Sequence, residues 1–413
     1  MSAKSWFEGI KSIIGVVAVS VLFAELSLVI ASAWSPKVDI LTRAPEDVPT
    51  AQIPDFRLGV RGNPAFPFHD ARGFRNDEAL ERADIVAIGD SHTYGTNVLP
   101  EEAWPAILAN GTGETVYNIS LGGYGAAHAN ENLETALSLK PHTIVFALYF
   151  GNDFFEDFRF AEKNGELAEF VSDEERNRID ALEKAGRIES EVGFLFGVIV
   201  GGAAGGPETD GEGDGLFREL ARWSRLAGFV HGLQHAFAAQ AGQPNLLAPD
   251  FETAVAGMTE RQKKYASPFD DGEWRTVLTA PYRFRVMDDS DLRIGVGLRI
   301  TRHMIRNMAE RVAAAGSKFR VVFLPTKEFV FGPRLADRNA HPAFSALMET
   351  EARMHREIGA FLDLEGIPYV DVASVLGSAK EQPYFVNGDG HPNPLGHSII
   401  AAEIGGFLER LEN

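Results

Sequence analysis

The chain begins with one long apolar stretch, which shorter apolar runs follow. The long stretch, Ser12 to Trp34, has 23 residues and a single charged one, Glu25. A helix of this length spans about 34 Å, enough to cross the hydrocarbon core of a bilayer. Lys4 and Lys11 precede it, and basic residues on this side favour a cytoplasmic N-terminus. The pattern therefore predicts a transmembrane anchor at residues 1–34, with the rest of the chain outside the cytoplasm.

A cleaved signal peptide is the alternative interpretation. Ala31, Ser32 and Ala33 resemble the small residues of a cleavage site, which would place the cut near Ala33. The apolar run is long for a signal peptide, which favours the anchor. Both interpretations export the remaining chain. Glu25 is costly in lipid, so it either faces a partner helix or is simply tolerated in a single helix.

Short apolar runs alternate with segments of helical spacing from residue 84 onward. Strands are predicted at 85–88, 115–119, 143–148, 319–324 and 368–372, and helices at 126–139, 300–315, 343–364 and 394–411. Alternation of this kind, with strands that are apolar throughout, predicts a five-stranded parallel sheet covered by helices on both faces.

The same pattern divides the rest of the chain into three parts. Residues 35–80 are rich in proline and polar residues and are predicted to be a linker that leads into the fold. The α/β domain covers residues 81–153 and 297–413. Residues 154–296 break the alternation, and we interpret them as a helical and glycine-rich insertion between the third and fourth strands.

The insertion itself has three recognisable segments. An acidic segment at 173–191 has helical character, and residues 201–215 are glycine-rich and predicted to form a loop. Residues 216–237 carry apolar side chains at helical spacing. We expect this amphipathic segment to pack on the core, with a substrate lid or a membrane-surface helix as the alternatives. The apolar run at 194–200 is too short to span a membrane.

Composition removes several classes of function. The chain has 413 residues and a formal net charge of −19. Such acidity argues against sequence-independent binding to nucleic acid, which needs a basic surface. There is no cysteine, so disulfides, thiolate metal sites and a cysteine nucleophile are excluded.

Four polar, glycine-rich segments follow four of the predicted strands. They are Gly89-Asp90-Ser91-His92, residues 118–125 (NISLGGYG), Gly151-Asn152-Asp153, and residues 389–393 (DGHPN). The carboxyl ends of parallel strands lie at one edge of the sheet, where ligands bind in open α/β sheets. We therefore expect the four segments to meet there.

The residue types in these segments are those of nucleophilic acyl chemistry. Ser91 is a weak nucleophile alone and needs a base, for which His391 is the best candidate because imidazole titrates near neutral pH. Asp389 would orient that imidazole. The backbone N–H groups of Ser91 and Gly123 and the side-chain amide of Asn152 would bind the developing oxyanion, each donor lowering the barrier by about 3 kcal/mol.

Each segment alone also fits an ordinary turn or a surface loop. A metal site built from Asp90, His92, Asp389 and His391 is a further, less favoured hypothesis. The catalytic interpretation is preferred because all the required chemical types occur in segments expected at one sheet edge. No metal or other cofactor is expected.

The four segments also resemble the sequence blocks of the SGNH, or GDSL-type, hydrolases. GDSHTYG at 89–95, NISLGGYG at 118–125, FGND at 150–153 and DGHPN at 389–393 match the four blocks in order. The resemblance covers roughly residues 70–153 and 297–413. It implies a flavodoxin-like three-layer αβα sandwich and ester hydrolysis or acyl transfer. It also implies Ser91 as nucleophile, Gly123 and Asn152 as oxyanion donors, and His391 as base.

Two further segments resemble one branch of that family. An N-terminal anchor, a GFR segment at 73–75 and a PTK segment at 325–327 are similar to those of exported proteins of polysaccharide O-acylation. That similarity implies an inner-membrane anchor with the catalytic domain facing the periplasm. Lys327 follows the fourth strand, so it either contacts substrate or is an ordinary exposed lysine.

The chain departs from the family pattern at two places. The usual acid lies three residues before the histidine, where this chain has Gly388. Asp389 lies only two residues before it, a spacing that resembles the O-acetylation branch. His92, directly after the nucleophile, is expected to have a surface role rather than a chemical one.

These observations lead to an expected serine esterase that acts on O-acyl esters, with acetyl as the expected acyl group, of a small molecule or a polysaccharide. An O-acyltransferase using the same serine is one alternative, and a catalytically silent glycan-binding or assembly module is another. The membrane is an expected partner through the N-terminal helix. The sequence indicates no protein partner.

Overall fold

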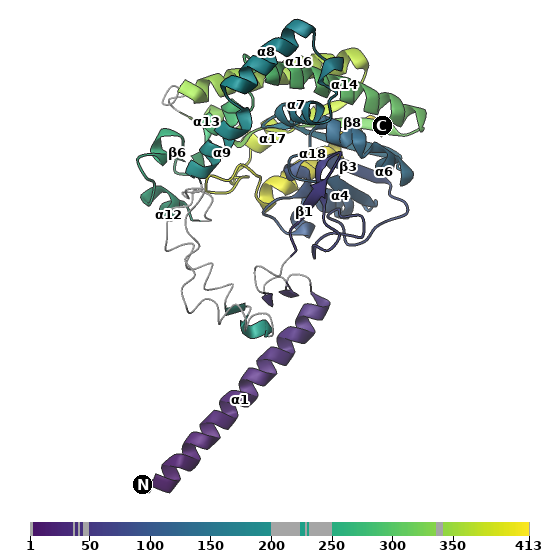
Figure 1. Ribbon diagram of the computed structural model, residues 1–413. Coiled ribbons are helices and arrows are strands. Elements are labelled where there is room, and N and C mark those ends of the chain that lie inside the picture. The colour runs from purple at the N-terminus through teal and green to yellow at the C-terminus, as the bar shows by residue number, and fades with distance from the viewer. Residues whose placement is uncertain are drawn as a thin grey trace.

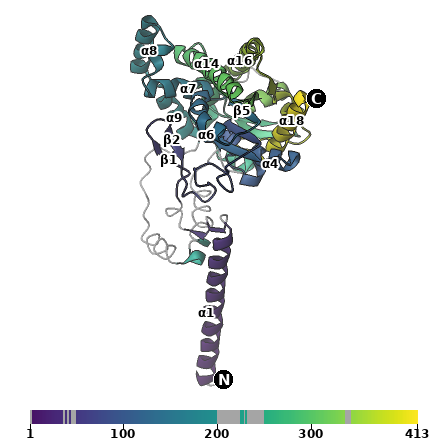
Figure 2. The ribbon, with the colours of Figure 1, turned by 90° about the vertical axis from the view of Figure 1, so that its right-hand side faces the viewer.

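The computed structural model describes residues 3–35, 38–39, 42–43, 49–199, 224–227, 229–230, 250–335 and 342–412. Helix α1 (Ala3–Trp34) projects from the folded body as a single long helix (Figures 1 and 2). Its segment Ile13–Trp34 is long and apolar enough to cross a membrane, and none of that segment is buried inside the protein. An anchor and a signal sequence both have these properties.

Glu25 of α1 has its partner on its own chain. Its carboxylate accepts hydrogen bonds from Ser224 Oγ at 2.8 Å and from the backbone N–H groups of Arg225 and Leu226 at 2.7 and 3.0 Å. Arg225 also pairs with Asp39 at 2.8 Å. The sequence predicted either a separate partner helix or no partner. Instead, the carboxylate binds the free N–H groups at the start of a short helical segment, as a helix cap does.

The body is built on a parallel sheet of five strands in the order β4-β3-β5-β8-β9. The strands are β3 (Ile85–Gly89), β4 (Val116–Ser120), β5 (Thr143–Tyr149), β8 (Lys318–Leu324) and β9 (Tyr369–Asp371). All five predicted strands are confirmed to within one residue at each end. The order reverses between β3 and β5, and such a switch point is where doubly wound folds bind ligands.

Helices cover both faces of this sheet (Figures 1 and 2). They are α4 (Trp104–Thr112), α5 (Ala126–Glu131), α6 (Leu133–Ser138), α7 (Asp153–Lys163), α14 (Leu292–Ala314), α16 (Pro342–Glu365) and α18 (Pro394–Glu412). Helices α4 and α18 pack together on one face, and α14 packs with α5, α7 and α16 on the other. The predicted three-layer αβα architecture is therefore confirmed.

Two predicted helices have different limits. The segment 126–139 is split at Asn132, whose side chain donates to the His128 carbonyl at 3.0 Å and so competes with the helical hydrogen bonds. Helix α14 begins eight residues before its predicted start at 300, because Asp291 caps it by accepting from the Arg293 N–H at 3.0 Å. The predicted domain limit at residue 297 thus falls inside a helix.

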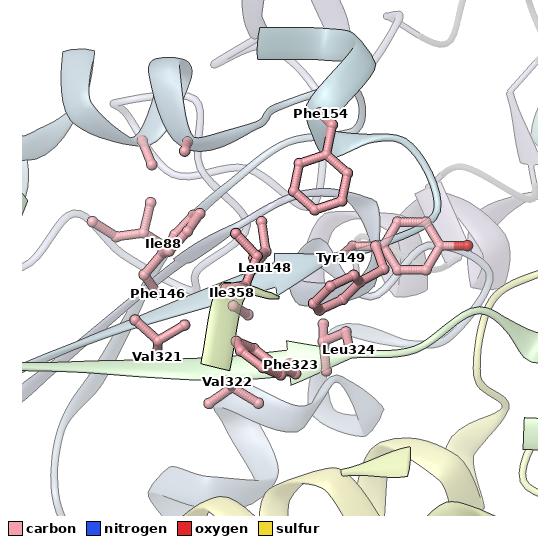
Figure 3. Packing of buried hydrophobic residues seen from close by; sticks show 14 of the residues in the cluster. Ile88, Phe146, Leu148, Tyr149, Phe154, Val321, Val322, Phe323, Leu324 and Ile358 are labelled. Carbon is pink, nitrogen blue, oxygen red and sulfur yellow. The ribbon is translucent and has the colours of Figure 1, made fainter. Parts of the chain in front are cut away.

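The sheet and its helices share one continuous core (Figure 3). Side chains of β5 and β8 form its centre, with Phe146 and Val322 fully buried. Phe154 of α7 and Ile358 of α16 pack against these strands. Complete burial of such side chains stabilises the fold by about 2 kcal/mol each, and it fixes the strand ends that carry the polar segments.

The segment expected to be a linker includes ordered structure. Strands β1 (Gln52–Asp55) and β2 (Gly59–Gly62) form an antiparallel hairpin. Arg57, in its turn, pairs with Glu131 and Glu166 of the body at 2.5 Å each. Asp70 accepts a hydrogen bond from the Tyr117 hydroxyl on β4. Residues 49–80 are therefore part of the folded domain.

The insertion is helical, as predicted, but also contains a hairpin. Its described elements are α8 (Asp173–Ala185), α9 (Ile188–Ile199), α12 (Phe251–Ala256), β6 (Ser267–Asp270), β7 (Arg275–Leu278) and α13 (Ala280–Arg285). The predicted glycine-rich loop at 201–215 and most of the amphipathic segment at 216–237 lie outside the described residues.

Candidate active site

Ser91 lies two residues after the end of strand β3, at the first position of the short helix α3 (Ser91–Tyr94). Asp90 caps this helix, because its carboxylate accepts from the His92 backbone N–H at 2.9 Å. Gly89 allows the tight turn: a β-carbon there would come within 2.3 Å of the Thr93 hydroxyl oxygen. The turn places Ser91 at the carboxyl edge of the sheet.

His391 reaches Ser91 from the other end of the sequence. Its Nε2 lies 2.9 Å from Ser91 Oγ, and its Nδ1 lies 2.7 Å from Asp389 Oδ1. Ser91 Oγ also lies 3.2 Å from Asp90 Oδ2, so its single proton has two acceptors, of which His391 is the nearer. Serine, imidazole and carboxylate thus form one hydrogen-bonded chain, as nucleophilic catalysis requires.

Asp389 stays ionised despite its burial. Burial alone would raise the pKa of Asp389, but the hydrogen bonds and charge of His391 and the charge of Lys327 lower that pKa well below its usual range. Asn97 Nδ2 donates to the second carboxylate oxygen. Asn97 has a φ of 67°, a left-handed conformation that asparagine tolerates better than most residues. Sequence reasoning missed Asn97.

Lys327 lies beside Asp389 in the interior of the protein and does not contact solvent. It begins helix α15 (Lys327–Phe331), and its side chain is fully buried. Its Nζ donates to the backbone carbonyls of Asp389, Asn387 and Val277 at 2.7, 2.8 and 3.0 Å, and contacts Thr276 Oγ1 at 3.1 Å. Both predictions for Lys327, contact with substrate and an exposed position, are therefore wrong. The lysine joins the loop of Asp389 to strand β7.

The charge of Lys327 is maintained at neutral pH. Burial lowers its pKa to about 8, an effect that the nearby Glu328 and Asp389 oppose. The ammonium group therefore remains protonated at pH 7, and an ammonium has three protons to share among its acceptors.

The candidate oxyanion donors lie around Ser91. Gly122 is adjacent to it, because a β-carbon on Gly122 would lie 3.7 Å from Ser91 Cβ. Gln52 of the β1–β2 hairpin donates to the Gly122 carbonyl at 3.0 Å. In a planar trans peptide the carbonyl and the next N–H point in opposite directions, so the Gly123 N–H points away from Gln52. Gly123 has a φ of 83°, which glycine adopts without strain.

Asn152 completes the set at the end of β5. It occupies the N-cap position of helix α7, where its side chain makes no capping hydrogen bond, and it lines the same cavity as Ser91 and His391. The structure thus brings Ser91, Asn152 and His391 to one edge of the sheet, at the switch point between β3 and β5. The Gly122–Gly123 turn after β4 lies beside them.

A second histidine adjoins the first. His92 was expected at the surface, but its side chain is 2% exposed and stacks on Tyr149 with a ring separation of 3.7 Å. Its Nδ1 lies 3.2 Å from Asp90 Oδ2, and its ring centre is 4.7 Å from that of His391. The surface prediction is wrong because the Tyr149 side chain from β5 covers this turn of α3.

Ser91 and His391 open onto a cavity of about 340 Å³. One wall is apolar and is contributed by the insertion, through Val192, Phe196 and Ile199 of α9 and Tyr282 and Val286 near α13. No role was predicted for this part of the insertion. Such a mixed lining of apolar wall and a few polar groups is typical of small-molecule sites.

The GFR segment supports the loop after Ser91. Arg75 donates to the backbone carbonyls of Tyr94 and Val98 at 3.1 and 2.7 Å and also to that of Gly95. Its guanidinium lies over the Tyr94 ring, 4.8 Å from the ring centre. Arg75 therefore fixes the end of α3 instead of contacting the cavity.

The metal hypothesis has no support in the geometry. Within the described parts of the chain, no three or more His, Asp or Glu side chains are arranged to hold a metal ion. Asp90 and His92 pair with each other, and so do Asp389 and His391. These contacts already engage one acceptor or donor of each side chain.

The segments that match the four sequence blocks lie together at the carboxyl edge of the sheet. The chain resembles the SGNH, or GDSL-type, hydrolases. No family model and no curated protein matches the sequence. Solved structures do match, at low identity.

Three of these solved structures are esterases or lipases by their names. A GDSL-like lipase from Bacteroides thetaiotaomicron VPI-5482 is 13% identical with a TM-score of 0.31, covering 80% of this chain and 89% of its own. An aryl esterase from M. smegmatis is 13% identical with a TM-score of 0.33, covering 79% and 98%. An acetyl-xylooligosaccharide esterase from Geobacillus stearmophilus is 11% identical with a TM-score of 0.32, covering 78% and 92%.

His397, behind the site, is expected to make stability depend on pH. Burial, and then the charges of His92 and His391, lower the pKa of His397 to about 3. In the unfolded chain histidine titrates near ~6.5, so between these values the unfolded state binds more protons. The contribution of His397 to the free energy of unfolding is therefore present above about pH 6.5 and is lost as the pH falls toward 3.

The measurement is the free energy of unfolding between pH 7 and 4 for the wild type and for His397→Asn. Asparagine can still accept from the Trp104 N–H, which lies 3.3 Å from His397 Nδ1, but does not titrate. We expect a smaller loss on acidification in the variant. Parallel curves for the two proteins would contradict the buried, neutral histidine.

Proposed function

We propose that this protein is a serine ester hydrolase that cleaves O-acyl esters, with Ser91 as the nucleophile. The observation that carries the proposal is the continuous chain from Ser91 Oγ through His391 to Asp389, at 2.9 and 2.7 Å. A serine hydroxyl within hydrogen-bond reach of an imidazole that a carboxylate orients is the arrangement that activates serine.

The reaction follows from these contacts. Ser91 Oγ attacks the ester carbonyl carbon while its proton moves to His391 Nε2. The carbonyl oxygen becomes an oxyanion that accepts from the N–H groups of Ser91 and Gly123 and from the Asn152 amide. His391 then gives the proton to the alcohol oxygen, the carbon–oxygen bond breaks and the acyl group stays on Ser91. Water, deprotonated by His391, releases the acid and restores the serine.

Asp389 is proposed to fix the His391 ring so that Nε2 faces Ser91. Its ionised carboxylate also stabilises the imidazolium that forms in both half-reactions. The acyl group is proposed to be small, with acetyl as the first candidate. The reaction requires no metal or other cofactor.

The proposed location is the outer side of the membrane that α1 spans. The basic residues before the apolar helix support a cytoplasmic N-terminus, which would place the catalytic domain in the periplasm. Cleavage near Ala33 would release the same domain. Substrates would then be acyl esters on small molecules or polysaccharides outside the cytoplasm.

An activity assay on the full chain in detergent tests the proposal. The purified protein should hydrolyse para-nitrophenyl acetate well above the rate without enzyme. With an oligosaccharide added as acceptor, free acetate as the product supports hydrolysis, whereas acetylated oligosaccharide would identify the protein as an acyltransferase that uses the same serine. A folded chain that forms neither product would favour a catalytically silent binding module.

Asn152 offers a quantitative check of the oxyanion site. Asn152→Ala is expected to lower kcat by about 10²- to 10³-fold with little change in KM, because the amide contributes mainly in the transition state. The half-buried Asn164 at the end of α7, which donates to the Phe160 and Arg57 carbonyls and does not line the cavity, gives a control in Asn164→Ala. An Asn152→Ala enzyme with unchanged kcat would remove this residue from the oxyanion site.

A further inference from the structure

The cavity beside Ser91 contains one arginine that the proposed reaction does not use. Arg283 lies on α13 of the insertion and lines the same cavity as Ser91, Asn152 and His391. Its guanidinium lies along the backbone of Gly390, since a β-carbon on Gly390 would come within 2.1 Å of Arg283 Nη2. Arg283 is therefore next to the residue that separates the proposed base from its carboxylate.

No carboxylate lies within 4.0 Å of the Arg283 guanidinium among the residues that the structure describes. Burial alone would lower the pKa of Arg283, but the charges of nearby groups, Glu328 and Asp389 among them, are near enough to raise that pKa. The Nε–H of Arg283 is buried and donates no hydrogen bond to any described residue. By contrast, Arg285, two residues later on the same helix, pairs with Glu191 and with Asp291. A guanidinium keeps its charge at any ordinary pH, so an unpaired one at the wall of a cavity is costly unless a ligand supplies the anion.

The neighbouring carboxylates make their hydrogen bonds to groups other than Arg283. Asp389 binds His391 and Asn97. Glu328 Oε1 accepts from the backbone N–H and the hydroxyl of Thr279 at 2.8 and 3.2 Å, and its buried Oε2 has no hydrogen bond to Arg283 or to any other described residue. Glu156 also lines the cavity, but burial raises its pKa to about 7. Its carboxyl group is therefore only partly ionised at neutral pH. The aromatic rings of Tyr149 and Tyr282 lie 5.8 and 5.1 Å from the guanidinium.

The side of the scissile bond follows from the chemistry of His391. In the proposed reaction His391 protonates the leaving alcohol, whereas the oxyanion donors face the acyl oxygen. Arg283 lies beside Gly390, directly before His391, and therefore on the side of the alcohol. We propose that Arg283 forms a carboxylate-binding subsite, so that the preferred substrates are acyl esters of alcohols that carry a carboxylate. This inference rests on the proposed function and narrows its substrate class.

Two matched esters test the subsite in the full-length protein in detergent. Para-acetoxybenzoate and para-acetoxybenzamide share the acetyl group and the scissile bond but differ in the charge on the alcohol part. After correction for spontaneous hydrolysis, the wild type should favour the carboxylate in kcat/KM by about tenfold or more, the range of a charge-assisted hydrogen bond. Arg283→Met should reduce this ratio to near unity. A ratio that Arg283→Met leaves unchanged would overturn the proposal.

The ratio is insensitive to a general loss of folded enzyme, because both esters are measured on the same preparation. Arg285→Met removes a cation from the same helix outside the cavity and should keep the wild-type ratio. Gly390→Ala gives a second route, since the added methyl group must push the Arg283 tip aside and should also lower the ratio. Loss of the preference in Arg285→Met would contradict a specific role for Arg283.

Binding of the two products separates this inference from the proposed function. Calorimetry with para-hydroxybenzoate and para-hydroxybenzamide needs no catalysis. Stronger binding of the carboxylate that disappears in Arg283→Met supports the subsite even if neither ester is hydrolysed, an outcome in which the hydrolase proposal alone fails. Equal binding of the two products by the wild type would overturn the subsite, whatever the enzyme hydrolyses.

Discussion

Ser91→Ala is expected to lower kcat/KM for para-nitrophenyl acetate by about 10⁴-fold or more, to a residual rate set by binding and the oxyanion donors. The variant loses the nucleophile but keeps the backbone N–H of residue 91 and the chain between His391 and Asp389. Fold and stability should change little, because the hydrogen bonds of Ser91 Oγ to described residues are those with Asp90 and His391.

The control is another serine whose hydroxyl makes a local contact. Ser138 is partly exposed and donates only to the Thr135 carbonyl at 2.7 Å, so Ser138→Ala should retain full activity. His391→Ala should show a loss close to that of Ser91→Ala. The double variant should be no worse than either, because residues that act as one unit are not additive. Additive losses, or a Ser91→Ala enzyme near wild-type rate, would contradict the mechanism.

Lys327→Met is expected to be the most damaging substitution outside the Ser91–His391 pair. It removes a buried donor that the carbonyls of Asp389, Asn387 and Val277 share, although the Asn387 carbonyl keeps the Thr276 hydroxyl at 2.9 Å. Loss of hydrogen bonds among buried groups is costly. The free energy of unfolding should fall by about 3 kcal/mol or more. Because the loop of Asp389 then loses its attachment to β7, kcat should also fall by about 10²-fold, the usual cost of a displacement of about 1 Å at a catalytic group.

Three readouts separate a positioning role from a purely structural one. If Lys327 positions Asp389, kcat falls at temperatures where the variant is fully folded, while KM changes less. Lys327→Arg should not restore the rate, because a planar guanidinium cannot replace a compact ammonium among these acceptors. Lys318→Met, at the exposed start of β8 where Nζ pairs with Glu412 at 3.1 Å, should change neither property. A destabilised Lys327→Met enzyme with normal kcat would leave the lysine only a structural role.

Much of the fold follows from local pattern alone. The five strands of the sheet are short apolar runs next to glycine or polar turns, and burial of a parallel sheet on both faces makes that signal continuous. The meeting of Ser91, Asn152 and His391 also follows, because parallel strands present their carboxyl ends at one edge. The position of each residue relative to the end of its strand was therefore enough to predict that the three side chains lie together.

The supporting contacts could not be predicted in this way. Lys327 is buried because backbone carbonyls of two distant segments converge on it, and a carbonyl belongs to every residue type alike. Asn97 reaches Asp389 across 292 positions of sequence. His92, on helix α3, is covered by Tyr149 of strand β5. In each case a side chain's surroundings are decided by tertiary packing, which carries no local signal.

The insertion shows the same limit at a larger scale. Its apolar run at 194–200 is too short to span a membrane, and the sequence alone did not indicate what the run packs against. Phe196 and Ile199 line the cavity of Ser91, so the insertion contributes the wall against which substrate would lie. Arg283, the proposed carboxylate-binding residue, comes from the same insertion, so that proposal assigns substrate selection to a region outside the four sequence blocks.

The central claim is that Ser91 is an activated nucleophile, and reaction with a fluorophosphonate tests it most directly. The full chain would be labelled in detergent and the adduct located by mass spectrometry of its peptides. The account predicts one adduct, on Ser91, that forms far more slowly in His391→Ala. A folded, ester-hydrolysing protein that carries no adduct on Ser91, or carries it on another residue, would contradict the account.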